Sequence, residues 1–280
     1  MATTADLPHL VRLLDDDSEI VRESVLSALA SFGPYLEIEL SRSNIATTDE
    51  DRHRLRNLLG QHARQWLQRS WHLWKESVED QTRLEQAMSL LAEFQYGPGY
   101  PASLTALLNK LEEDYRRRTA DLDPLSLASY LFKTRGLVGA EKDYHNPFHS
   151  NLVYVIEVGR GIPFSLATIF ILVGGRLQMD IRGINFPGHF LARACHHGTV
   201  YVVDCFNGGR FLQEHDLAAY NRGAASQIAG LIDASCPAET IIARCLRNLN
   251  HSYRQEDQPE NAALMAELLQ TVAPDADDTQ

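Results

Sequence analysis

Residues 160–177, RGIPFSLATIFILVGGRL, decide the fold because a glycine and a proline stand directly before an almost uninterrupted apolar run. Proline is favoured at the first position of a helix, and an apolar surface on all sides is typical of a helix inside a protein core. The stretch therefore predicts a buried helix that begins near Pro163. Ser165 falls at or just inside its N-terminus.

The N-terminus of this helix makes Ser165 a candidate nucleophile. The positive end of the helix dipole stabilises an alkoxide or a thiolate, and free backbone N–H groups there can hold an oxyanion. Serine is also a preferred capping residue, so the position alone is explained more simply by a structural role. A catalytic interpretation needs further residues.

The segment NFPGHFLARACHHGTVYVVD supplies two such residues, because it predicts a β-hairpin with strands at His189–Cys195 and Thr199–Asp204 and a turn within 196–198. His189 begins the first strand and Asp204 ends the second. With a two-residue turn, both side chains lie on the same face of the sheet, opposite or one pair apart. The carboxylate of Asp204 can then orient the imidazole of His189.

Serine, then a helix, then a histidine and an aspartate on successive strands resembles the transglutaminase-like superfamily, with Ser165 in place of the nucleophilic cysteine. The motifs DYHNPFHSNL, GRGIPFSL, FPGHFLAR and VDCFNGGRFL resemble the SirB-type branch, whose members show comparable NP-x-x-S, RRGIP, PGHF and DPF-x-GG elements. ARCLRNLNHSY at 243–253 resembles the helical tail of that branch. The resemblance covers about Leu84 to Tyr253 and implies an α+β fold with a papain/transglutaminase-like core, a buried helix packed on an antiparallel sheet.

This sequence departs from the branch at three points. Cys205 stands where the branch usually has proline, and Gly159 replaces the first arginine of RRGIP. The tetratricopeptide-like tail of longer members is expected to be short or absent after Tyr253, which weakens any expectation of partner binding through such a tail.

Composition changes along the chain predict an all-helical N-terminal region and a short helical C-terminal tail around that core. Two amphipathic helical patterns divided by Asp15–Asp17 resemble a HEAT-type hairpin, and the polar stretch Ser41–Asp51 predicts a linker. Gly97–Pro101 predicts a helix break. The predicted regions are a HEAT-like helical hairpin at 1–40, a helical region at 41–135, a transglutaminase-like α+β core at 136–215 and a helical tail at 216–280.

The charge of the chain argues against two classes of partner. A formal net charge of −11 and a pI near 5.4 disfavour nucleic acid and anionic membrane surfaces. The N-terminus has no basic region followed by an apolar run, and no apolar stretch approaches the ~20 residues that span a bilayer. We therefore predict no nucleic-acid partner and no membrane partner.

The four cysteines form no C-x-x-C pair and are predicted to be free thiols in a reducing cytoplasm. Cys195 and Cys205 lie on strands beside the candidate site and stay open as displaced nucleophiles, although buried cysteine usually acts as a small apolar residue. His145 and His149 have helical spacing, but Pro147 between them argues against a metal pair. No metal and no cofactor are predicted.

Two functions are compatible with Ser165, His189 and Asp204. A serine hydroxyl is far less ionised than a thiol near neutral pH, which favours a non-catalytic or regulatory module, a pseudoenzyme whose vestigial cleft binds a protein or peptide. The alternative is a Ser-His-Asp amide or ester hydrolase or acyltransferase, with Ser165 as nucleophile, His189 as general base and Asp204 orienting it. The sequence leaves open whether the chain is an enzyme.

Overall fold

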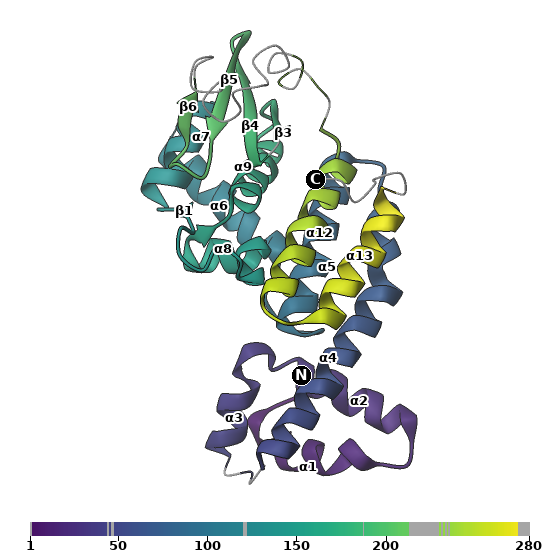
Figure 1. The fold of residues 1–280 in the computed structure, drawn as a ribbon. Helices are drawn as coiled ribbons and strands as arrows, with labels where there is room; N and C mark the ends of the chain where they lie inside the picture. The colour runs from purple at the N-terminus through teal and green to yellow at the C-terminus, as the bar shows by residue number, and fades with distance from the viewer. Residues whose placement is uncertain are drawn as a thin grey trace. The chain divides into compact units, whose positions relative to one another are not determined.

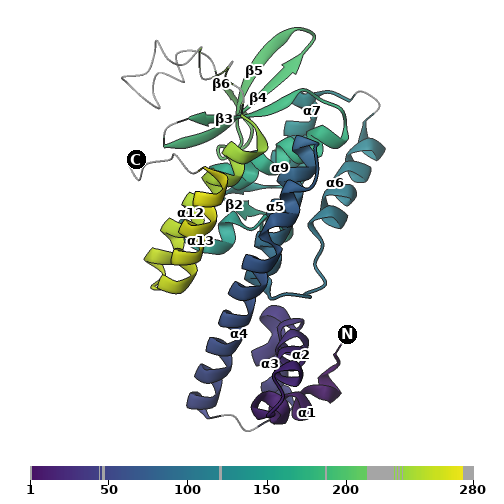
Figure 2. The same ribbon diagram turned by 90° about the vertical axis from the view of Figure 1, so that its right-hand side faces the viewer.

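Helices, a four-stranded sheet and a short two-stranded sheet occur in the computed structural model (Figures 1 and 2). It describes residues 2–43, 45, 48–119, 122–186, 188–212, 230, 232, 234 and 236–273. The last residues of the predicted core, 213–215, and most of the first part of the predicted tail, 216–237, lie outside the described residues. The chain divides into two compact units, Met1–Leu73 with Leu90–Ala102 and Trp74–Ser89 with Ser103–Gln280.

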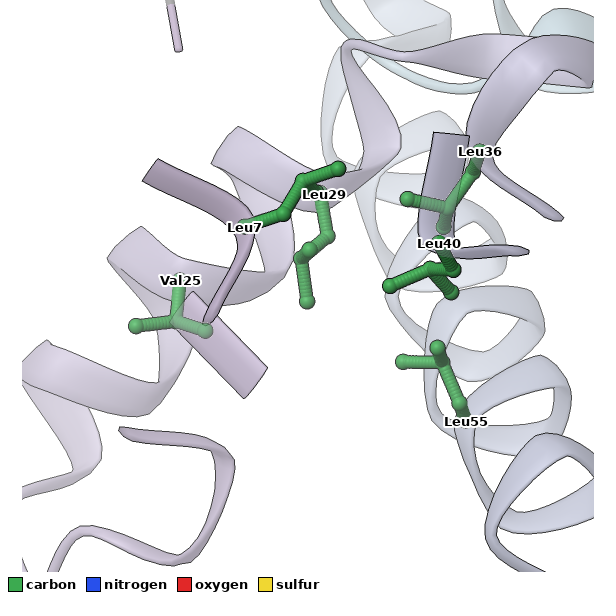
Figure 3. Close-up of a cluster of buried hydrophobic side chains, with 6 residues drawn as sticks. All are labelled: Leu7, Val25, Leu29, Leu36, Leu40 and Leu55. Carbon is green, nitrogen blue, oxygen red and sulfur yellow. The ribbon is translucent and has the colours of Figure 1, made fainter. Parts of the chain in front are cut away.

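The first unit is helical and is held together by leucine packing. Figure 3 shows its core, in which Leu7, Val25 and Leu29 come from the first two helices and Leu36, Leu40 and Leu55 from the next two. All six side chains are buried. The elements are η1 (Thr4–Asp6), α1 (Leu7–Arg12), η2 (Leu13–Asp15), α2 (Glu19–Ala30), η3 (Gly33–Tyr35), α3 (Leu36–Arg42), α4 (Asp49–Ser70), most of η4 (Trp71–Lys75) and the end of α5 (Asp80–Tyr96).

The predicted polar stretch Ser41–Asp51 contains the start of α4. The hydroxyl of Thr48 accepts a hydrogen bond from the backbone N–H of Asp51 at 3.1 Å, and the Asp51 carboxylate accepts one from the N–H of Thr48 at 3.0 Å. This reciprocal capping box satisfies two N–H groups that have no partner within the helix. A local signal therefore determines where α4 begins.

The second unit carries the sheet and the helices around it. Figure 2 shows the C-terminal pair, α12 and α13, lying side by side. The unit contains the first part of α5 and then α6 (Leu104–Arg118), α7 (Pro124–Ser129), η5 (Tyr130–Thr134), β1 (Val138–Gly139), η6 (Pro147–Ser150), α8 (Leu152–Val158), β2 (Arg160–Gly161), α9 (Pro163–Arg176), β3 (Ile181–Phe186), β4 (His189–His196), β5 (Thr199–Asp204), β6 (Arg210–Leu212), α12 (Ala238–Gln255) and α13 (Pro259–Val272).

The sheet is antiparallel, in the order β3-β4-β5-β6. His196 pairs with Thr199, so the hairpin turn consists of His197 and Gly198, both with positive φ. Two successive residues of this kind form the turn that matches the twist of a β-hairpin. The turn is thus the two-residue turn at 197–198 that the sequence allowed, and β4 extends one residue beyond the predicted strand end, to His196.

The predicted buried helix is α9, and it packs on one face of this sheet. Its residues from Pro163 to Gly174 are buried without exception. The rings of Phe164 and Phe190 meet edge to face at 5.8 Å between centroids. The opposite face of the sheet is also buried, by a cluster that includes Ile184 and Leu191. The predicted fold class is therefore confirmed: a buried helix on an antiparallel sheet, with a helical N-terminal region.

A π-helix follows α7 directly. Pro124–Ser129 is α-helical, and the chain continues as a π-helix over Tyr130–Thr134. The hydrogen bond of a π-turn joins residues five apart, one more than in an α-helix, and no local sequence pattern indicates it. Such turns are frequent at functional sites.

The described ranges include no helix with both the length and the apolar composition that crossing a bilayer requires.

Candidate functional site

Ser165 is the third residue of α9 and belongs to the core. Its side chain has no exposed surface, and its hydroxyl donates a hydrogen bond to the carbonyl of Ile162 at 3.0 Å. The same carbonyl accepts the backbone N–H of Leu166 at 3.2 Å. The serine hydroxyl is therefore engaged within the first turn of its own helix.

Gly161 leaves room for this hydroxyl. A β-carbon at position 161 would come within 2.5 Å of Ser165 Oγ, a distance that side chains do not adopt. Gly161 is held by the short parallel ladder with Gly139, and its carbonyl accepts the N–H of Ala140 at 2.9 Å. The glycine of the GIP motif therefore allows the Ser165 hydroxyl to lie at this position.

His189 and Asp204 are joined by a hydrogen bond, with His189 Nε2 at 3.2 Å from Asp204 Oδ1. The observed register places Ala192 opposite Val203, so Asp204 lies opposite Leu191, and His189 is one pair further along on the same face. The histidine side chain is 13% exposed and the aspartate side chain is fully buried. The predicted contact between these two residues is present.

The Asp204 carboxylate also shapes the turn that follows β5. Oδ1 accepts the backbone N–H groups of Phe206 and Asn207, both at 3.1 Å, and Oδ2 accepts the side-chain amide of Asn207 at 2.6 Å. These bonds form an Asx-type turn, in which a carboxylate replaces a backbone acceptor. The aspartate therefore has a structural task beside its contact with the imidazole.

Ser165 and His189 come from neighbouring elements, yet their side chains bond elsewhere. Phe164 on α9 touches Phe190 on β4, which brings the two elements together. Because side chains alternate along a strand, His189 points to the sheet face opposite that of Phe190. The hydroxyl of Ser165 is bonded to Ile162, and the imidazole of His189 to Asp204.

A chain of ring contacts, which we call the aromatic cluster, leads from His189 through Phe206, Tyr144 and His145 to His251. The ring of Phe206 lies edge to face with His189 and with Tyr144, each at 6.3 Å between centroids. His145 lies 5.6 Å from Tyr144 and 5.1 Å from His251. Tyr144, His145 and His251 are exposed.

The sequence reasoning did not identify the aromatic cluster as a unit. Tyr144 and His145 belong to the motif DYHNPFHSNL and Phe206 to VDCFNGGRFL, so the motifs contained the residues. Their contact depends on chain segments about 60 residues apart, as well as on His251 from α12. Membership in these motifs was the only indication in the sequence that the residues belong to the site.

The two cysteines beside the site are poorly placed as nucleophiles. Burial raises the pKa of the Cys205 thiol well above its ordinary value, and the Asp204 carboxylate raises it further. Cys195 lies six residues beyond His189 along β4, about 20 Å away at the usual rise of a strand. All four cysteines are free thiols.

His145 and His149 lie in different surroundings. His145 is exposed and faces His251, whereas His149 is buried beside Tyr154, and burial lowers the pKa of its imidazole. The described part of the chain contains no group of three or more histidine, cysteine or acidic side chains that could hold a metal ion.

Comparisons with known proteins agree with the motifs. A family model described as "Transglutaminase-like superfamily" matches residues 99–247, more than half of the chain. A UPF0162 protein of Xylella fastidiosa (strain Temecula1) is 34% identical over 216 residues, which cover 72% of this chain and 77% of the relative.

Two further relatives match shorter segments. A UPF0162 protein of Vibrio cholerae is 28% identical over 50% of this chain and 53% of its own length. Protein SirB1 of Salmonella typhimurium is 29% identical over 41% of this chain and 44% of its own length. No solved structure matches the chain.

Proposed function

This chain belongs to the transglutaminase-like superfamily, in its SirB-type branch, and from that premise we propose that it is a non-catalytic module that binds a protein or peptide segment. Ser165 takes the nucleophile position without acting as a nucleophile. Of the other two triad-equivalent positions, Asp204 holds the turn after β5, and His189 bonds Asp204 beside the binding surface.

The state of the Ser165 hydroxyl is the observation that carries this proposal. A serine nucleophile needs a base within hydrogen-bond reach and access for the substrate carbonyl. The Ser165 hydroxyl has no exposed surface and donates a hydrogen bond to the backbone carbonyl of Ile162. Within the part of the chain that the structure describes, this hydroxyl is engaged by a backbone carbonyl and not by a base, and its burial leaves no room for an incoming carbonyl.

The aromatic cluster supports binding of a protein or peptide. Aromatic side chains bury a large area at little entropic cost and are enriched at protein interfaces. Tyr144 is 42% exposed and lies beside Phe206, which in turn contacts His189. A cytoplasmic location is part of the proposal and fits the four free thiols.

Labelling with a fluorophosphonate tests the absence of catalysis, because the reagent modifies serines that are activated as nucleophiles. We expect no label on Ser165 in the wild-type protein and the same result for Ser165→Ala and His189→Ala. Label on Ser165 that disappears in both variants would overturn the proposal and support the Ser-His-Asp hydrolase or acyltransferase instead.

Selection from a random peptide library on the immobilised protein tests the binding role. Peptides selected by the wild-type protein should bind Tyr144→Ala about tenfold more weakly, because a buried aromatic anchor contributes at least 1–2 kcal/mol. Phe211→Ala is the matched control, since Phe211 is equally exposed, at 42%, but lies outside the aromatic cluster. Equal losses in the two variants, or no selected peptide, would contradict the binding role.

A further inference from the structure

A concave site apart from Ser165, His189 and Asp204 lies in the second unit, between α6, η5 and α8. These elements enclose a cavity of about 400 Å³. Figure 1 shows α6 and α8 as neighbours in the teal part of the chain, and residue contacts join the two helices. Volumes of this order are typical of sites for small molecules.

The π-helix η5 shapes one wall of this cavity. The backbone N–H of Arg135 donates to the carbonyl of Tyr130 at 2.8 Å, which closes the wide turn. Tyr130 is 5% exposed, and its hydroxyl donates to the carboxylate of Asp114 at 2.8 Å. The turn therefore holds the Tyr130 ring in the wall and sets Arg135 directly after it.

Four basic side chains line the cavity, and one of them is already paired. Arg118 donates to Asp114 at 3.1 Å and lies over the Tyr130 ring at 5.9 Å. Lys110, Arg117 and Arg135 are exposed and form no ion pair within the residues that the structure describes.

The cavity therefore has a positive local charge. Asp114 and Glu157 are the acidic side chains of its lining, so the four basic groups leave a formal excess of two positive charges. The chain as a whole carries −11. Cationic residues in the last turn of a helix also offset the helix dipole, which accounts for Arg117. Arg135 is the C-cap of η5 and has the same explanation, whereas Lys110, in the middle of α6, lies outside it.

Three apolar side chains also line the cavity, and we call them the apolar floor: Leu107 and Leu111 of α6 and Ile156 of α8. A ligand that fits both features has an anionic group for the basic side chains and a small apolar body for these three. Guanidinium groups bind phosphate oxygens through two parallel N–H bonds, and a dianion matches the excess of two charges.

We propose that this cavity binds a small organic phosphate monoester, with the phosphate held by Lys110, Arg117 and Arg135 and the organic part on Leu107, Leu111 and Ile156. The site is separate from Ser165, His189 and Asp204, so it stands or falls independently of the function proposed above.

Isothermal titration of the full chain with phenyl phosphate tests the proposal. We expect saturable binding that weakens as the salt concentration rises, because ionic contacts are screened. The double variant Arg117→Gln/Arg135→Gln should lose about tenfold or more in affinity. Inorganic phosphate should bind more weakly than phenyl phosphate, because it leaves the apolar floor empty.

Arg116→Gln is the matched control, because Arg116 lies on the same helix, α6, but pairs with Glu112 at 2.9 Å and lies outside the cavity lining. It should bind phenyl phosphate as tightly as the wild-type protein. All variants should retain the wild-type melting temperature, since the replaced side chains are exposed. No binding at millimolar phenyl phosphate, or an equal loss in the Arg116→Gln control, overturns the site. Equal affinities for the two phosphates overturn the role of the apolar floor.

Discussion

The N-terminus of α9 and the turn after β5 supply the two halves of one candidate site, and their polar side chains are held in different ways. Ser165 is fully buried and bonded within its own helical turn. His189 is 13% exposed and lies beside aromatic rings that reach the surface. The first half therefore belongs to the core, whereas the second lies at the boundary between the core and the surface. The position of a residue in a motif that resembles a family's motif does not by itself give that residue a chemical role.

The largest expected effect concerns the helix that makes the first half a core. Phe170 has no exposed surface and packs edge to face on Phe132 at 6.0 Å between centroids. Phe170→Ala should lower the free energy of unfolding by about 3–5 kcal/mol, because the cavity cannot close fully. Urea denaturation followed by circular dichroism measures the loss. A loss below about 1 kcal/mol would show that α9 is not central to the core.

Asp204→Asn sharpens the comparison from the other half. The substitution keeps the shape of the side chain but removes a buried charge that accepts bonds from Phe206, Asn207 and His189. We expect a loss of about 2–3 kcal/mol in unfolding free energy.

His189→Ala is the control for that substitution. It leaves the bonds from Phe206 and Asn207 to the carboxylate in place, so its cost should stay near 1 kcal/mol. If it costs as much as Asp204→Asn in the same denaturation experiment, the imidazole and not the turn is what the carboxylate mainly stabilises.

Ser165→Ala should have a small effect. The Ile162 carbonyl that accepts the hydroxyl still accepts the N–H of Leu166, so no buried acceptor loses all its partners. We expect a loss of at most about 1 kcal/mol, measured as above. A loss above about 2 kcal/mol would mean that the hydroxyl has a further partner.

Ser165→Cys should produce almost no new reactivity. A helix N-terminus lowers the pKa of a thiol, but full burial raises it and also excludes the reagent. Iodoacetamide at pH 7 should therefore modify the introduced thiol no faster than Cys245, whose pKa is raised by complete burial. Peptide mass spectrometry measures each rate.

Cys236 serves as the internal pH reference for this reaction. Burial and the nearby Asp80 carboxylate raise its pKa to about 11, so its alkylation should accelerate about tenfold for each unit of pH below that value. Rapid modification of Ser165→Cys at pH 6, abolished by His189→Ala, would show that the two halves act together as a working site.

Local signals were enough to predict α9 and the β4–β5 hairpin. The long apolar run after Pro163 predicts a buried helix. The alternation of residues around His197 and Gly198 predicts a hairpin, and its register places His189 and Asp204 on one face. The hydrogen bond between these two residues follows from that register. Each conclusion depends on residues close together in the chain.

The sequence by itself determined the family, the buried helix and the His189–Asp204 contact, because periodicity, turn residues and spaced motifs are local properties. Only the tertiary structure decided that Ser165 is bonded to Ile162 and that Tyr144 meets Phe206. It also placed Arg117 and Arg135 around one cavity. Burial and contacts between distant segments depend on how every neighbouring element packs, and no local pattern of residues encodes that arrangement.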